Sequence, residues 1–371
     1  MTKRFIPVAA PVLVGNEKEY VMDCLDSTWI SSNGKYIERF ESAFAEFCGV
    51  RHATSCCNGT AALHLALMAL GVKQGDEVIV PTLTFVATAN AVTYCGARPV
   101  FVDSEPETWN VNPDLIEARI TPRTKGIIVV HLYGHPVDMD PIVGVARRKG
   151  LFVIEDAAEA HGAEYKGRAV GSLGDIATFS FYGNKIMTAG EGGMVVTDND
   201  SLMATVRQLK GQGWDPSRRY WFPVIGYNYR MTNVAAAIGL AQLEKAGWHI
   251  LRRRDVAGWY HEYLRDMPLL TKPVEKEWAR NVYWMFSVVL DEKLSVERDA
   301  VIFALAERGI ETRPVFHPMH TLPPYRGLAR GQRFPVAERI ASGGINLPTW
   351  AGLTKKDVKF VCDALRECTM G

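Results

Sequence analysis

The chain has 371 residues, more than the ~150 of an average domain, so two domains are the first expectation. Hydrophobic residues make up 47% and charged residues 22%, which is typical of a globular protein and excludes a disordered or collagen-like chain. Lys plus Arg number 42 and Asp plus Glu 41, giving a formal net charge of +1. A chain so balanced has no overall attraction to nucleic acid or to an anionic membrane surface.

The cysteines and the apolar runs indicate the compartment. No apolar run approaches the ~18 residues that span a bilayer, and the start, MTKRFIPVAAPVLVG, lacks the continuous apolar core of a signal peptide. The seven cysteines are odd in number, scattered and without a CxxC pair, which argues against a disulfide framework or a zinc ribbon. We therefore expect a reduced, cytoplasmic protein.

Between about residues 55 and 200, short β-branched runs alternate with longer helical stretches. Several runs are apolar almost throughout, as in strands buried on both faces of a parallel sheet. The expected strands are Glu77–Pro81, Pro99–Asp103, Gly126–Leu132, Leu151–Glu155, Ala177–Phe181 and Gly193–Thr197. Stretches such as Thr60–Leu70 and Pro141–Lys149 predict the crossover helices of a three-layer α/β domain.

The pattern changes after residue 210. Gly211–Thr232 is rich in aromatic residues and has neither helical nor strand periodicity, which indicates a long functional loop. Asn233–Tyr260 predicts a long helical segment, and a smaller α+β region follows, with a strand at Trp284–Leu290 and helices at Val296–Arg308 and Thr354–Cys368. We expect a large domain over residues 1–250 and a smaller C-terminal domain over residues 251–371.

A single lysine stands in the glycine-containing turn SFYGNK, directly after an expected strand. In open α/β sheets, ligands bind beyond the carboxyl ends of the strands. Lys185 is therefore either a surface lysine in a loop or a nucleophilic amine that forms a Schiff base.

Asp156 follows another expected strand in VIEDAAEAHG, at the same edge of the sheet. Its carboxylate could cap a helix, bind a metal, act as a base, or keep the pyridinium nitrogen of pyridoxal phosphate protonated, which makes the ring an electron sink. Glu159, three residues on, would reach another edge of such a ring. One cofactor explains Asp156 and Lys185 together better than two coincidences do.

A phosphate group would also need a cradle. SCCNGT, at Ser55–Thr60, leads into an apolar helix whose N-terminal N–H groups suit a phosphate monoester, although Thr60 could simply cap the helix. Ser180 could add a hydroxyl. Phe85, in PTLTFVAT, is a candidate for stacking on the face of a ring.

An ordered set of motifs carries a family resemblance. The set comprises NGT, PTLTFVATAN, HLYG, IEDAAEAHG, GDIATFSFYGNK, GEGGMVVT and GYNYRMT, and the likeness extends from about residue 7 to the C-terminus. The chain resembles the DegT-type sugar aminotransferases, which are pyridoxal-phosphate enzymes of the aspartate-aminotransferase fold (fold type I). SFYGNK, the segment 211–233, RPVFHPMH and INLPTWAGLT are similar to the subgroup that aminates C4 of GDP-4-keto-6-deoxy-D-mannose.

The resemblance implies roles for residues at matching positions. Lys185 would bind the aldehyde of pyridoxal 5'-phosphate, Asp156 would pair with the pyridinium, Glu159 would lie near the ring oxygen and Phe85 would stack on the ring. The phosphate would be held by Gly59, Thr60 and Ser180, and by Asn228 of the partner subunit in a homodimer with shared active sites. Where many relatives carry Gln, this chain has Glu159, so its ionisation stays open. L-Glutamate would be the amino donor, with ping-pong kinetics.

The substrate contacts are less specific. In the loop, Arg218, Arg219 and Arg230 suit a diphosphate, and Tyr220 with its aromatic neighbours suits a base or sugar, but the same residue types favour a dimer interface. In RPVFHPMH we expect Arg313 and His317 to contact sugar, amino acid, carboxylate or phosphate. A metal on His317 and His320 is not expected, because Pro318 breaks the helical geometry and no acid is near.

Alternatives of other kinds stay open. The acceptor could be a UDP- or dTDP-linked keto-sugar, since no readable residue identifies the base. A non-catalytic regulator of the same fold is disfavoured by the presence of both Lys185 and Asp156. An NAD-dependent dehydrogenase is disfavoured because no GxGxxG follows the first strand.

Overall fold

The computed structural model describes residues 4–370. Its largest sheet has seven strands in the order β1-β9-β8-β5-β4-β2-β3. All run in the same direction except β9, which is antiparallel to both of its neighbours. The bounds are β1 His52–Cys56, β2 Glu77–Pro81, β3 Arg98–Val102, β4 Thr124–Val130, β5 Phe152–Asp156, β8 Ile176–Ser180 and β9 Gly193–Thr197.

The expected mixed α/β fold with a mostly parallel sheet is confirmed. The six predicted strands all form, two of them (β2 and β9) with the predicted bounds and the others displaced by one or two residues. They were readable because their side chains are buried throughout or nearly so. Strand β1 was not predicted, since its sequence HATSC is no apolar run, although four of its five residues are buried.

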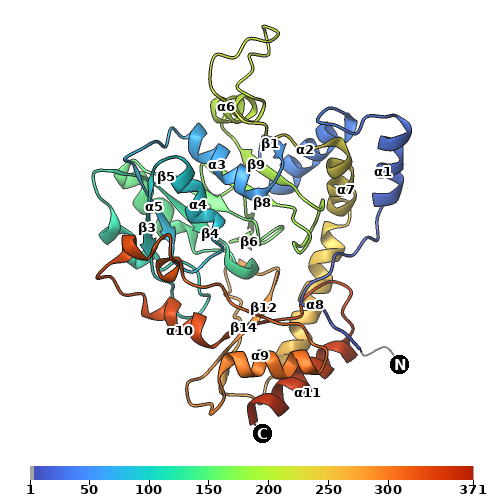
Figure 1. Cartoon of the computed structure of the whole chain (residues 1–371), viewed down its shortest axis with the longest axis vertical. Helices are drawn as coiled ribbons and strands as arrows, with labels where there is room; N and C mark the ends of the chain where they lie inside the picture. Colours follow the sequence, from blue (N-terminus) through green and yellow to red (C-terminus); the bar gives the residue numbers. More distant parts are fainter. Residues whose placement is uncertain (1–3, 371) are drawn as a thin grey trace.

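Helices flank this sheet (Figure 1). α3 packs against β8 and β9, α2 packs against β1 and α7, and α5 packs against β5. The bounds are α1 Glu17–Asp26, α2 Lys35–Cys48, α3 Gly59–Ala69, α4 Ala87–Tyr94, α5 Met139–Lys149, α6 Asp200–Lys210 and α7 Asn233–Leu243. Short 3-10 helices occupy connections at Pro113–Leu115, Glu117–Arg119, Leu132–Gly134, Met319–Thr321 and Arg326–Ala329.

The helical segment predicted over Asn233–Tyr260 is present, but it is divided into two helices. The segment forms α7 and a second helix, α8 (Ala246–Tyr263), because Lys245 leaves the helical conformation at φ −110° and ψ 12°. Both parts are apolar at helical positions, so the periodicity does not reveal a break of two residues.

The C-terminal part forms an antiparallel sheet in the order β10-β12-β14-β13. Its elements are β10 Leu270–Thr271, β12 Phe286–Leu290, α9 Arg298–Glu307, β13 Arg313–Pro314, α10 Pro335–Gly343, β14 Gly344–Leu347 and α11 Lys355–Met370. A third small sheet joins β11 (Ala279–Arg280) to β6 (Glu164–Tyr165), and β6 to β7 (Arg168–Ala169).

The described residues form two hydrophobic cores, which correspond in part to the expected large and small domains. One is formed by the seven-stranded sheet and the helices packed against it, and the other joins α8, β12, α9 and α11. Trp284 and Phe334, however, belong to the first core although they come late in the chain. The expected domain boundary near residue 250 falls inside α8, and the division into two domains stays a prediction.

The segment 211–232, here called the arm, stands out from the rest of the molecule beyond α6 (Figure 1). Its two ends are held together, since the N–H of Gln212 donates to the carbonyl of Tyr227 at 2.9 Å. The apolar side chains between residues 214 and 225 are open to solvent, with Tyr220 76% and Ile225 89% exposed. The predicted long loop is therefore present, and only its end joins the core of its own subunit, through Met231 and Tyr229.

Among residues 4–370, no helix combines the length and the apolar character needed to cross a membrane.

Candidate active site

A cleft of about 730 Å³ opens where the strands of the large sheet end. Val130, Asp156 and Ser180, the last residues of β4, β5 and β8, lie on its wall, and residues 313–317 and Asn346 of the C-terminal sheet close it from the other side. Since β5 lies between β4 and β8, the sheet topology alone brings these ends together.

Lys185 lies in the turn after β8, where its own N–H donates to the carbonyl of Tyr182 at 3.0 Å. The side chain is mostly buried and lines the cleft. Burial lowers the pKa of Lys185, while the negative charges of Glu159 and Asp156 act in the opposite direction. A lowered pKa leaves more of the amine unprotonated, which is the form that attacks a carbonyl carbon.

Asp156 ends β5 and is held by two donors. The hydroxyl of Thr88 donates to Oδ2 at 2.8 Å, and the N–H of Ala158 donates to Oδ1 at 3.3 Å. Burial raises the pKa of Asp156, and these hydrogen bonds and the charge of Lys185 oppose the rise. No α-helix follows Asp156 directly, so the alternative of a helix cap does not apply. A cationic ring nitrogen is the partner that such a buried carboxylate lacks.

Glu159 lies in the loop after β5, where Oε2 accepts the N–H of Tyr133 at 2.7 Å. Burial raises the pKa of Glu159 to about 7, against the pull of the nearby Lys185 charge. The carboxyl can therefore be protonated near neutral pH. Glu159 and Asp156 are thus two acids in one cleft with different hydrogen-bond environments.

The N-terminus of α3 also lines the cleft. Asn58 is its N-cap and accepts the N–H of Ala61, so the possible capping role of Thr60 is wrong. Within residues 4–370, the N–H groups of Gly59 and Thr60 have no acceptor. A Cβ on Gly59 would come within 2.8 Å of the Cβ of Ser180, so only glycine allows this approach. Two free N–H groups, two hydroxyls and a helix N-terminus make a phosphate site.

Phe85 also lines the cleft and presents an apolar ring to it. It is 54% exposed and contacts Phe316, with 5.8 Å between ring centroids. An exposed phenyl ring inside a cleft offers a face on which a planar ligand can stack.

These groups fit pyridoxal 5'-phosphate. The N-terminus of α3 with Ser180 suits its phosphate, Lys185 its aldehyde, Asp156 its ring nitrogen and Phe85 its face. The fold and this set of donors define a pyridoxal-phosphate-dependent enzyme of fold type I. Residues 11–366 match the DegT/DnrJ/EryC1/StrS aminotransferase family. The chain belongs to that family and is an aminotransferase.

Named relatives narrow the comparison. The chain is 58% identical to GDP-perosamine synthase of Caulobacter vibrioides, over 97% of each chain. It is 52% identical to GDP-perosamine synthase of Escherichia coli O157:H7, over 98% of each chain. Among solved structures, a protein from Streptococcus pneumoniae, in a PLP form and a PMP form, superimposes with a TM-score of 0.93 at 28% identity, over 98% of each chain.

The residues predicted from the sequence fall into two groups. Nine line the cleft: Gly59, Thr60, Phe85, Asp156, Glu159, Ser180, Lys185, Arg313 and His317. The other five lie on the arm, outside the cleft of their own subunit: Arg218, Arg219, Tyr220, Asn228 and Arg230. Within the arm, Asn228 accepts hydrogen bonds from Arg230, and Arg218 lies over the ring of Trp221.

His320 points away from the cleft. Its ring bonds Thr82 at 2.7 Å and Glu338 at 3.1 Å, so the expectation that no acid lies near these histidines is wrong for His320. Glu338 is 18 residues further on and reaches it only through the fold. Among the described residues, no group of three or more His, Cys, Asp or Glu side chains is placed to hold a metal ion.

Several residues around the cleft were not assigned a role from the sequence. Thr88 touches Asp156, and Tyr133, at φ +54°, directs its N–H to Glu159. The Tyr133 ring stacks between Trp284 and Phe316, with centroids 6.1 and 5.3 Å away. Trp284 lies about one hundred residues from Lys185 in the chain, so only the fold brings them together.

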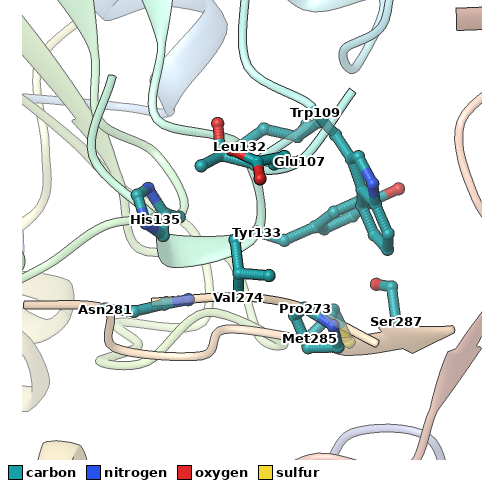
Figure 2. Close-up of a pocket in the computed structure, with 11 residues that line it drawn as sticks. Glu107, Trp109, Leu132, Tyr133, His135, Pro273, Val274, Asn281, Met285 and Ser287 are labelled. Atoms are coloured by element: carbon teal, nitrogen blue, oxygen red, sulfur yellow. The ribbon is translucent and has the colours of Figure 1, made fainter. Parts of the chain in front are cut away.

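A second, smaller cavity borders Tyr133 (Figure 2). Residues between 107 and 135 line one side, and Pro273, Val274, Asn281, Met285 and Ser287 line the other. Met285 also lines the cleft. The indole N–H of Trp109 is buried here without a hydrogen-bond acceptor among the described residues. Tyr133 lies beside this cavity and also stacks on Trp284 and Phe316 of the C-terminal part of the chain.

Proposed function

We propose that the protein transfers the amino group of L-glutamate to C4 of GDP-4-keto-6-deoxy-D-mannose, producing GDP-perosamine for O-antigen or another surface polysaccharide. The observation that carries the proposal is the 58% identity to a GDP-perosamine synthase over 97% of both chains. Lys185, Asp156 and the phosphate site in one cleft supply the machinery that this reaction needs. They also argue against a non-catalytic regulator of the same fold.

The residues have the following roles in this proposal. Bound pyridoxal phosphate supplies an electron sink for the carbon that loses or gains a proton. Lys185 would hold the cofactor at its aldehyde, and its free amine would take up the proton that Cα of glutamate loses. In the second half-reaction, Lys185 delivers a proton to C4 of the sugar. Asp156 keeps the ring nitrogen protonated, and its burial excludes water from that contact.

The substrates share one cleft in turn. Arg313 and His317 stand at its mouth as exposed cationic or hydrogen-bonding groups, and Arg313 pairs with Glu311 at 3.1 Å. We assign Arg313 to a carboxylate or phosphate and His317 to the sugar. Both substrates are anionic, so a single cationic group can serve each half-reaction.

The arm completes the site of a second copy. Its exposed apolar side chains, with Tyr220 76% and Ile225 89% exposed, require a covering surface. We propose a homodimer in which Asn228 of the partner subunit reaches the phosphate, and Arg218, Arg219, Arg230 and Tyr220 reach the nucleotide. Arginine and tyrosine suit both an interface and a diphosphate.

An amination assay against GDP-, UDP- and dTDP-linked 4-keto-6-deoxy sugars tests the substrate. We expect turnover with the GDP-linked sugar and parallel lines in double-reciprocal plots, as in ping-pong kinetics. Equal or faster turnover of a UDP or dTDP sugar would assign the runner-up substrate. Lys185→Ala is the control, and activity at the wild-type level in this variant would exclude the role of Lys185.

Mixing two inactive variants tests the shared site. If each site takes Lys185 from one subunit and Asn228 from the other, a Lys185→Ala subunit and an Asn228→Ala subunit together form one intact site. Random mixing should then restore activity in about a quarter of the sites. Mixtures no more active than the two variants alone would contradict the assignment of Asn228.

We also place the reaction in the cytoplasm. All seven cysteines are free thiols, and four of them (Cys24, Cys48, Cys56 and Cys362) are buried. Free thiols are typical of a reducing compartment. Mass spectrometry after alkylation of protein taken directly from cells should find the seven thiols unoxidised.

A further inference from the structure

The face of an indole ring lies against the amine of Lys185. Nζ of Lys185 is 3.9 Å from the centroid of the Trp284 ring, within the range of a cation–π contact. Trp284 is only 4% exposed, so this contact is shielded from water. It comes from the segment before β12, in the C-terminal part of the chain, whereas Lys185 follows β8.

The position of Trp284 is fixed from three sides. Its Nε1–H donates to the carbonyl of Asn184 at 2.8 Å, so the ring is tied to the residue before Lys185. Its carbonyl accepts from Arg253, which is buried, at 2.9 Å. Its ring stacks on Tyr133 at an interplanar angle of 19°. A side chain held this firmly can define where a flexible lysine rests.

We propose that Trp284 is a positioning residue for Lys185, and that its indole face holds the amine in place whenever Lys185 is not bonded to the cofactor. In the reaction, Lys185 is free in the interval when it must move a proton. A lysine side chain has several rotatable bonds, and a fixed resting place near the reacting carbon reduces the entropy lost on the way to proton transfer. The inference rests on the role proposed for Lys185, but not on the identity of the sugar.

The charges around Lys185 allow a distinctive test. Asp156 and Glu159 face it from the end of β5, and His161 nearby is neutral because burial lowers its pKa to about 3. An indole face favours the ammonium form, so removal of the ring should lower the pKa of Lys185. If Trp284 acted only as apolar packing, its removal would admit water and would raise the pKa of Lys185.

The measurement is competitive acetylation of the full-length protein, freed of cofactor, with trace acetic anhydride between pH 6 and 11. Peptide mass spectrometry compares Lys185 with the exposed Lys356. Because an indole contact shielded from water contributes about one pKa unit, Trp284→Leu should lower the pKa of Lys185 by about that much. Trp284→Phe keeps a ring of weaker attraction and should lower it less. Trp278→Leu removes a partly buried indole that contacts Tyr165 and His135, away from the cleft, and should not change it.

The holoenzyme gives a second readout. Trp284→Leu should reduce kcat for amino transfer at least tenfold and leave KM for glutamate within about twofold, with partial recovery in Trp284→Phe. An unchanged or higher pKa of Lys185 in Trp284→Leu, or an equal fall in Trp278→Leu, would overturn the proposal. If Trp284→Leu does not fold, the proposal is overturned when the pKa of Lys185 in Trp284→Phe equals or exceeds that in the wild type. Failure of the proposed sugar as substrate would leave these pKa measurements unaffected.

Discussion

The hydroxyl of Thr88 donates a hydrogen bond to Oδ2 of Asp156 at 2.8 Å, and both side chains are buried. Thr88 belongs to α4 and Asp156 to β5, so this bond joins two elements at the base of the cleft. The donated bond stabilises the ionised carboxylate against the effect of burial. Asp156 can therefore stay negative opposite a pyridinium.

Thr88→Val should reduce kcat/KM about tenfold. The valine keeps the shape of threonine but leaves the carboxylate without a hydrogen bond worth about 1.5 kcal/mol, which corresponds to about one power of ten in rate. The pKa of Asp156 should rise, so the acid limb of the pH–rate profile should move to higher pH. Thr93→Val is the matched control, because Thr93 lies on the same helix and its hydroxyl bonds Ala89 and Tyr325 instead of Asp156. Equal losses in both variants would indicate a general effect on α4.

Asp156→Asn should retain cofactor binding but lose amino transfer by about three powers of ten or more. A neutral amide cannot keep the ring nitrogen protonated, and each power of ten corresponds to about 1.4 kcal/mol of barrier. Single-turnover measurement of the glutamate half-reaction isolates this step from substrate exchange. A rate within tenfold of the wild type would remove Asp156 from the mechanism.

The sequence predicted nine of the residues that lie on the walls of the cleft. Asp156 and Lys185 were found because each follows a strand, and parallel strands end at one edge of a sheet. Buried strands are continuous apolar runs, so their positions could be read within one or two residues. Residues that position these two side chains could not be found this way. Trp284 reaches Lys185 only through tertiary packing.

Local patterns also failed where the chain breaks without a signal. α7 and α8 are separated at Glu244 and Lys245 without a glycine or proline to mark the end of either helix. The arm was predicted as a loop, but its sequence does not say that it projects from the subunit. Which of its side chains meet a partner depends on a second chain, which no pattern within one sequence describes.

Gly59→Ala should weaken the binding of pyridoxal phosphate at least tenfold. A Cβ at this position would come within 2.8 Å of the Cβ of Ser180, and the two residues would have to separate around the phosphate site. Absorbance titration of the apoprotein with cofactor measures the effect. Gly247→Ala, in α8 with nothing within 4 Å, should bind as the wild type does. Wild-type affinity in Gly59→Ala would contradict the placement of the phosphate at α3.

Glu159→Gln should stabilise the cofactor-free protein at alkaline pH. Burial raises the pKa of Glu159 from 4.5 to about 7. Folding stability from such a carboxyl is present below pH 4.5 and is lost as the pH rises through 7, whereas glutamine stays neutral throughout. Urea unfolding should therefore find the variant similar to the wild type at pH 5 and more stable at pH 8.5, by at most about 3 kcal/mol. Glu292→Gln, at an exposed site, should show no such trend.

Glu155, next to Asp156 on β5, is fully buried and accepts four hydrogen bonds. The donors are Nε2 of His131 and the N–H groups of Gly171, Leu173 and Gly174, at 2.7 to 3.0 Å. Burial alone would raise the pKa of Glu155, but these bonds lower it below its ordinary value. Its contribution to stability is thus present above pH 4.5 and is lost as the pH falls through the lowered pKa.

Glu155→Gln should destabilise the protein by about 3 kcal/mol at pH 7, because its amide NH₂ would face N–H donors in a site without water. The difference from the wild type should shrink as the pH falls and Glu155 becomes protonated. Urea unfolding at pH 7 and pH 4 measures both effects. Glu164→Gln breaks an ion pair with Arg280 that is partly open to solvent, and it should cost less than about 1 kcal/mol. A cost as small in Glu155→Gln would mean that the loop at 171–174 can move away from β5 and find other acceptors for its N–H groups.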